Sequence, residues 1–207
     1  MGAKRKEADI EEVMATFTEH VAANYPEPRR FRDNLAGMLE AKKERLPPAS
    51  YIEALEKNLV FLIDLVTEGE AYLELVLGRV NDRRLGAEEI AATIAEMERR
   101  VRASAVRRRG ELLGAAGAGE LGRLAELRAR DGGAYLDKLE FNYMYYMAMR
   151  IFLFEFFNVL VSARDEYSVR RVDEAAFDYV RNHVVMTTNF YLGNIAVGKV
   201  MPEPGLA

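Results

Sequence analysis

Apolar residues recur with a helical period along most of the chain, and one stretch is apolar on every side. Residues 134–163, AYLDKLEFNYMYYMAMRIFLFEFFNVLVSA, hold nine of the twenty aromatic side chains of the protein. Because neighbouring residues of a helix point about 100° apart, these aromatic side chains face all directions and leave no polar face. A helix of this kind is usually buried, so we expect 134–163 to be the central helix of an all-α domain.

The flanking segments have the spacing of amphipathic helices, with apolar residues three or four positions apart. No segment alternates apolar and polar residues as a half-buried strand does, and no repeat of fixed length occurs. The chain of 207 residues is long enough for one domain with a sizeable core. The sequence therefore predicts a single all-α domain, 1–207, built as a bundle of six to seven helices at 7–24, 29–45, 50–81, 86–109, 120–130, 134–163 and 172–199.

The segment 50–81 carries a seam like that of a coiled coil. Nine positions alternate spacings of three and four, and eight of them are apolar, which gives a period close to 3.5. The exception is Gly69, which predicts either a close helix contact or a local bend, or else a surface position without a role. The nine positions are Ile52, Leu55, Leu59, Leu62, Val66, Gly69, Leu73, Val76 and Val80.

One stripe of each remaining amphipathic helix is expected to face the core. Capping boxes at Asp9–Glu12 and Ser50–Glu53 mark two helix starts, and glycines indicate a hinge at 110–133. Residues 162–171 are expected to form a charged turn and residues 200–207 a loose tail. The expected inward residues are Ile10, Val13, Met14, Phe17, Val21, Phe31, Leu35, Met38, Leu39, Ile90, Ile94, Met97, Val101, Phe177, Val180, Val184, Tyr191 and Ile195.

Residues 141–161 are long enough to cross a bilayer, so a membrane span has to be weighed. The stretch contains Arg150 and Glu155 near its middle. Each charge at mid-span costs about 2.5 to 3.5 kcal/mol on insertion scales, and the aromatic and leucine residues barely offset two of them. We therefore expect a buried helix of a soluble domain, not a membrane insertion.

Composition limits the partners and the compartment. A net charge of -4 and a pI near 5.5 give no overall attraction to nucleic acid or to anionic membranes. Six arginines lie between 99 and 109, but flanking glutamates and the lack of interleaved aromatic residues favour a solvated face over a nucleic-acid site. The absence of cysteine and of an apolar segment after the basic N-terminus fits a cytoplasmic protein.

Residues that could carry catalysis or bind a metal are few. Neither His20 nor His183 has a second histidine at i+3 or i+4, and neither completes a Glu-x-x-His motif. The sequence contains no phosphate-binding loop and no Gly-x-Ser-x-Gly elbow. Since no nucleophile–base pair is visible, we expect a non-catalytic protein without a metal site, and the sequence identifies no cofactor.

Two charges within the apolar stretch, Arg150 and Glu155, have no opposite charge three or four residues away. If they are buried, each needs a partner on another helix, and a structural ion pair is the favoured interpretation. His183 is a candidate partner of Glu155. Alternatively, these groups hold the polar end of an apolar ligand in a pocket between 134–163 and 172–199, whose candidate lining residues are Tyr143, Tyr146, Arg150, Glu155, Asn158 and His183.

Two functions remain open. The leading hypothesis is a non-catalytic interaction or regulatory protein that self-associates as a homodimer, through the 52–80 seam or the aromatic helix. Its basis is that two uncharged helical stretches and a heptad seam are more apolar surface than a small bundle easily buries. The alternative is a sensor that binds an apolar small molecule with one polar end in the pocket described above.

Overall fold

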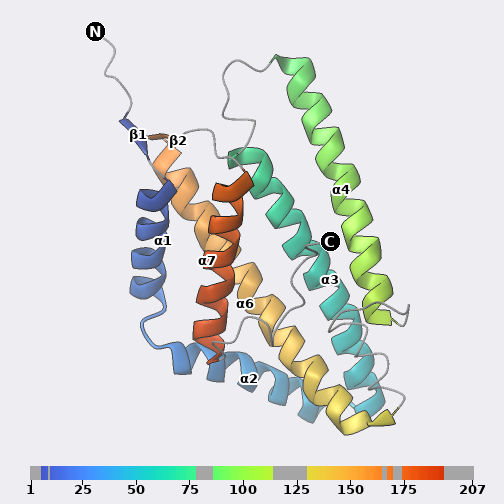
Figure 1. The fold of residues 1–207 in the computed structure, drawn as a ribbon. Coiled ribbons are helices and arrows are strands. Elements are labelled where there is room, and N and C mark those ends of the chain that lie inside the picture. The colour runs from blue at the N-terminus through green and yellow to red at the C-terminus, as the bar shows by residue number, and fades with distance from the viewer. Residues whose placement is uncertain are drawn as a thin grey trace.

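Six helices make up most of the described structure and confirm the predicted all-α bundle (Figure 1). They are α1 (Ile10–Asn24), α2 (Pro28–Arg45), α3 (Pro48–Leu75), α4 (Ala87–Leu113), α6 (Gly132–Arg164) and α7 (Glu174–Leu192). The structure is a computed structural model, and it describes residues 6–8, 10–77, 86–113, 130–164, 167–169 and 174–193.

The aromatic helix α6 is central, as predicted. It packs against α1, α3 and α7, while α2 crosses the lower end of the bundle (Figure 1). Its residues Phe152 and Phe156 are fully buried, and both contact rings from neighbouring helices. Among the described helices, none combines the length and the apolar character that a membrane span requires.

The heptad seam of α3 packs within the chain. Its positions Leu55, Leu59, Leu62, Val66 and Leu73 are buried, and α6 is the main neighbour of α3. The two helices run in the same direction, because the hydroxyl of Tyr51 near the start of α3 donates to Glu140, whereas Tyr72 near its end contacts Phe157. The seam is therefore covered by the chain itself and is not a free surface.

A short strand pair closes one end of α1 and α6, where the sequence predicted none. Strand β1 (Lys6–Ala8) pairs in parallel with β2 (Tyr167–Val169), and Lys6 lies opposite Tyr167. Residues 7 and 8, predicted to begin a helix, belong to β1. The turn predicted at 162–171 is also wrong, because α6 runs to Arg164 and residues 167–169 form β2. Strands of three residues are too short to show an alternating pattern.

Several helix boundaries also differ from the prediction. Helix α4 continues through Gly110 to Leu113, and α6 already begins at Gly132, so both ends of the predicted hinge 110–133 are helical. The carboxylate of Asp131 accepts hydrogen bonds from the amides of Gly133 and Ala134, which caps α6. Residues 114–129 lie outside the described part, and with them the rest of the hinge and most of the 120–130 helix.

The last helix is shorter than predicted. It ends at Leu192, and Gly193 follows with φ 74°, a left-handed conformation that commonly terminates helices. The predicted residues 194–199 and the tail 200–207 lie outside the described part, as does the predicted cap Asp9. Helix α3 begins at Pro48 without a side-chain cap, so Ser50 lies inside its first turn.

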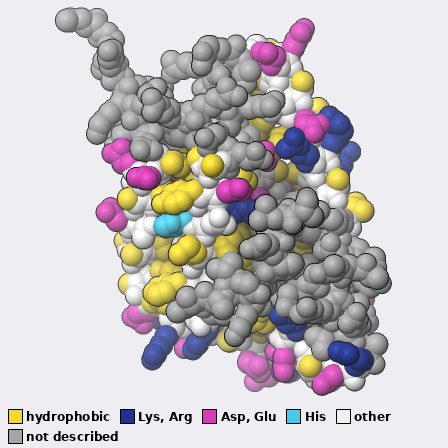
Figure 2. Space-filling model, in the orientation of Figure 1, with side chains coloured by type: hydrophobic (Ala, Val, Ile, Leu, Met, Phe, Trp, Pro, Cys, Tyr) yellow, Lys and Arg dark blue, Asp and Glu magenta, His cyan; other side chains and the backbone are white. Residues whose placement is uncertain are grey.

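Large apolar side chains remain exposed in the described structure. Met38 and Ile94, both expected in the core, are 54% and 40% exposed. Hydrophobic side chains gather over α1 and α7 in Figure 2. Along α7, the exposed residues Tyr179, Met186 and Phe190 follow helical spacing and form a stripe. A second exposed group joins α3 to α6 and consists of Phe61, Tyr72 and Phe154.

Replacing Gly69 by alanine should stabilise the fold. An alanine Cβ at this position would lie 3.7 Å from Cδ1 of Leu153, an ordinary contact, so no clash opposes the better helix propensity of alanine. We expect the free energy of unfolding in urea to rise by about 0.5 to 1 kcal/mol. Gly37→Ala on α2 is the control, since nothing lies within 4 Å of its added Cβ. A gain at Gly37 with a loss at Gly69 would contradict this packing.

Candidate functional sites

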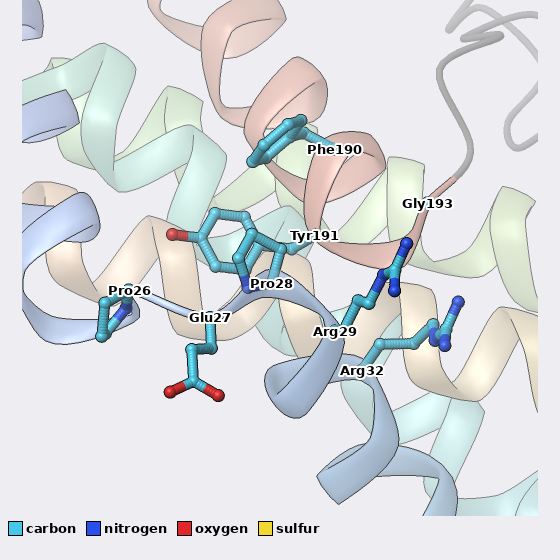
Figure 3. A pocket seen from close by; sticks show the side chains of 8 residues that line it. All are labelled: Pro26, Glu27, Pro28, Arg29, Arg32, Phe190, Tyr191 and Gly193. Atoms are coloured by element: carbon cyan, nitrogen blue, oxygen red, sulfur yellow. The ribbon is translucent and has the colours of Figure 1, made fainter.

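A cavity of about 710 Å³ lies where the α1–α2 turn meets the end of α7 (Figure 3). The side chains of Arg29 and Arg32 extend side by side toward Gly193, whereas Glu27 points away from them. Arg32 also contacts the carboxylate of its exposed neighbour Asp33 at 3.0 Å. The full lining is Pro26, Glu27, Pro28, Arg29, Arg32, Phe190, Tyr191 and Gly193. The site therefore combines apolar walls with two cationic groups.

The sequence alone does not predict this cavity. The basic residues at the start of α2 are visible in the sequence, but their apolar partners on α7 lie more than 150 positions further along the chain. No local pattern connects segments so far apart. The local signal of a turn here is the pair of prolines, Pro26 between α1 and α2 and Pro28 at the start of α2.

A cluster of four aromatic rings forms the base of the α1–α2 turn. Tyr25, Phe31, Phe152 and Tyr191 contact one another with ring centroids 4.9 to 6.4 Å apart. The hydroxyl of Tyr191 donates a hydrogen bond of 2.7 Å to the backbone carbonyl of Tyr25. The cluster thus fixes the turn to α6 and α7, and it holds the wall of the cavity in place.

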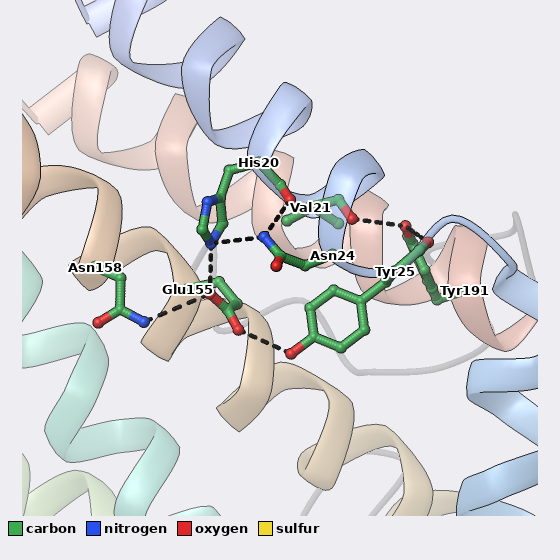
Figure 4. Close-up of polar contacts among 7 residues, drawn as sticks. All are labelled: His20, Val21, Asn24, Tyr25, Glu155, Asn158 and Tyr191. Atoms are coloured by element: carbon green, nitrogen blue, oxygen red, sulfur yellow. Dashed lines mark hydrogen bonds and ion pairs between the residues drawn. The ribbon is translucent and has the colours of Figure 1, made fainter.

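Glu155 connects α6 to α1 through the same turn (Figure 4). Its Oε2 lies 2.7 Å from Nε2 of His20, and its Oε1 accepts a hydrogen bond of 2.8 Å from the hydroxyl of Tyr25. The amide of Asn158 adds a longer contact of 3.5 Å. Glu155 is therefore held mainly by His20 of α1 and Tyr25 of the following turn, which agrees with the favoured interpretation of its charge.

The electrostatics of this network also indicate a structural role. Burial by itself would raise the pKa of Glu155, but hydrogen bonds from His20, Tyr25 and Asn158 outweigh it and leave the pKa below its usual value. Burial and the bond to Glu155 raise the pKa of Tyr25 to about 12. At neutral pH the carboxylate is thus ionised and the tyrosine remains a proton donor.

His183 does not pair with Glu155, so this part of the prediction is wrong. Its Nε2 lies 3.0 Å from Oγ1 of Thr18, and its ring packs against Phe17. Burial lowers the pKa of His183. His20 lies on α1 and His183 on α7, beside α1. The spacing of residues within one helix does not predict which of the two histidines reaches Glu155 on α6.

The remaining predicted ligand contacts are spread over different environments. Tyr146 is buried in the core, and Tyr143 is half-buried with the ammonium of Lys42 5.5 Å from its ring centre. Burial raises the pKa of Tyr143. Arg150 and Asn158 are exposed. Of the two charges expected to hold the polar end of a ligand, Glu155 is bound by His20 of α1 and Arg150 points to solvent, while His183 contacts Thr18 of α1.

A second cavity, of about 190 Å³, lies between α3, α4 and α7. Its charged groups form two ion pairs, Arg181 with Glu70 at 3.5 Å and Arg100 with Glu74 at 3.6 Å. These charges balance each other, so the arrangement is typical of helix–helix packing. Within the described residues, no three carboxylate or histidine side chains gather as a metal site.

The exposed aromatic residues lie on adjacent outward sides of α3 and α6, which together we call the α3–α6 outer face. Phe154 is 64% exposed, Phe61 59% and Tyr72 57%. Phe157 joins the two helices, because its ring lies 5.4 Å from that of Tyr72. The face consists of Phe61, Leu65, Glu68 and Tyr72 on α3 and of Met147, Arg150, Phe154 and Phe157 on α6.

Comparisons with protein-family models, with curated proteins and with solved structures found no match for this chain. Function is therefore inferred from the geometry of these sites. Three features bear on it: the Glu155 network, the cavity beside Arg29 and the α3–α6 outer face.

Replacing Glu155 by alanine should destabilise the protein. The change removes the acceptor of the His20 and Tyr25 contacts, and we expect unfolding free energy at pH 7 to fall by about 1 to 3 kcal/mol, as for hydrogen bonds to a charged group. Because the pKa of Glu155 is lowered in the folded state, its contribution is complete above the ordinary value of 4.5. The difference between wild type and Glu155→Gln should therefore shrink as the pH falls below 4.5.

Urea melts across this pH range measure both effects. Glu19→Ala, which changes an exposed glutamate on α1, is the control and should alter stability by less than about 0.5 kcal/mol. The structural role would be refuted by an equally small effect at Glu155, or by a difference that stays constant into acid.

Proposed function

We propose that the protein is a non-catalytic helical interaction protein that self-associates as a homodimer. The observation that carries this proposal is the α3–α6 outer face, on which Phe61, Tyr72 and Phe154 are each more than half exposed. Single exposed apolar residues are common, but a contiguous apolar patch of large side chains usually marks an interaction site.

The composition of the face supports the same function. Aromatic residues, methionine and arginine are enriched at protein–protein interfaces, whereas lysine and glutamate are depleted. The α6 half of the face carries Met147, Arg150, Phe154 and Phe157, and the α3 half has one charged residue, Glu68. A membrane-active helix would instead carry several lysines or arginines beside its apolar side.

The route of association differs from the one suggested by the heptad seam. The seam residues of α3 are buried against α6 of the same chain, so a second copy cannot use them without unfolding the bundle. What supports association is the outward side of the same two helices. The aromatic helix thus contributes to the interface in the proposal, and the seam serves the fold.

The cavity beside Arg29 favours a second candidate function, the binding of a small amphipathic anion. Its volume of about 710 Å³ falls in the range of small-molecule sites. Phe190 and Tyr191 offer apolar contacts, while Arg29 and Arg32 suit a carboxylate, sulfonate or phosphate group. This cavity is not the pocket expected between 134–163 and 172–199, although the end of α7 contributes to both.

Phe154→Glu should convert the dimer to a monomer, because it places a charge in the middle of the apolar face. Sedimentation velocity of the purified protein at micromolar concentration measures this directly. Phe190→Glu on α7 is a matched control, since Phe190 is 60% exposed and Phe154 64%. A monomeric wild type, or a dimer lost only with Phe190→Glu, would refute association through α3 and α6.

The anion site is tested with anilinonaphthalene sulfonate, a fluorescent probe with an aromatic body and one negative charge. We expect saturable binding that weakens at least about tenfold in Arg29→Ala/Arg32→Ala, which corresponds to about 1.4 kcal/mol. Arg45→Ala, at the far end of α2, should leave binding unchanged. Equal binding by all three proteins would exclude this cavity as the site.

A further inference from the structure

We infer that the two copies associate about a two-fold axis through the α3–α6 outer face, with Arg150 of each copy opposite Glu68 of the other. This inference rests on the proposed self-association and adds the surface and the register of the two copies. It follows from the way one cation and one anion are placed on an otherwise apolar face.

The two charges belong to the same surface. Phe154 follows Arg150 by one helical turn, and Phe157 lies beside Phe154 on the same side of α6. The ring of Phe157 contacts Tyr72, which follows Glu68 by one turn on α3. Arg150 and Glu68 thus lie on the two halves of a face that the Tyr72–Phe157 contact joins.

Both charges are exposed, and neither has a partner among the residues that the structure describes. Within the described structure, neither Arg150 nor Glu68 makes an ion pair or a hydrogen bond through its side chain. By contrast, glutamates elsewhere on α3 are paired, for example Glu53 with Lys57 and Glu74 with Arg100. A charge that is covered without a partner is costly, so whatever covers this face must supply an acid opposite Arg150 and a base opposite Glu68.

A second copy of the chain meets this requirement. A two-fold axis that lies in the plane of the interface and bisects the line between the two charges places each Arg150 over the other copy's Glu68. The aromatic residues Phe61, Tyr72 and Phe154 then surround the two ion pairs.

Other occupants fit less well. The face carries one positive and one negative charge, which gives no net attraction to an anionic lipid surface. The residues of the exposed stripe on α7, Tyr179, Met186 and Phe190, are uncharged and so offer no ion pair of their own between copies. Charge complementarity therefore selects the α3–α6 outer face and a second copy of the chain.

Charge reversal tests the pairing in the full-length protein. Arg150→Glu alone places two acids opposite each other, and Glu68→Arg alone places two bases opposite each other, so each variant should dimerise at least about tenfold more weakly than wild type. Mixing the two variants should restore dimers, because the new acid of one then faces the new base of the other. The double variant should also dimerise like wild type.

Sedimentation velocity distinguishes the outcomes, and far-UV circular dichroism checks that each variant is folded. If wild type is monomeric, self-association itself fails. If wild type is dimeric but the single variants are unaffected, or the mixture stays monomeric, the dimer forms with another face or register and this inference alone is overturned. If either reversal misfolds, Arg150→Ala and Glu68→Ala replace the reversals, and each should also weaken dimerisation relative to wild type.

Discussion

The structure depends most on the burial of α6. Water that reaches a helix which is apolar around its whole circumference destabilises the fold, so the neighbouring helices must cover it with apolar stripes on as many sides as they can. The seam of α3 covers one side, and the stripes of α1 and α7 cover others. The side that carries Phe154 is left without a neighbour in the described structure. The proposed association thus rests on the composition of one helix.

One polar connection orients this apolar arrangement. Glu155 lies in the most apolar segment of the chain, and its carboxylate turns toward His20 and Tyr25 on the α1 side. Tyr25 in turn accepts a hydrogen bond from Tyr191 at the end of α7. The network therefore fixes the angle at which α1 and α7 meet α6, and it shapes the cavity beside the α1–α2 turn. Packing supplies most of the stability, and the hydrogen bonds select among similar packings.

The sequence predicted what depends on local periodicity. The all-α class, the central helix and the buried seam all follow from spacing that can be read within one segment. It did not predict which helix covers which face: His183 was only a candidate partner of Glu155, which His20 binds, and Met38 and Ile94, expected in the core, are exposed. The end of α7 at Leu192 was not predicted, because the uncharged residues of the sequence continue past Gly193. The cavity and the outer face join distant segments, and no local pattern records such contacts.

Whether a second copy covers α6 can be measured by electron spin resonance, because the chain has no cysteine and a single introduced one carries the label. Asn158→Cys places a nitroxide at the rim of the α3–α6 outer face, one turn from Phe154, and Asn182→Cys places one on the exposed side of α7. Coverage by a second copy predicts a single, well-defined distance between the two Asn158→Cys labels, shorter than between the Asn182→Cys labels. No dipolar coupling at either position, or a shorter distance on α7, would contradict it.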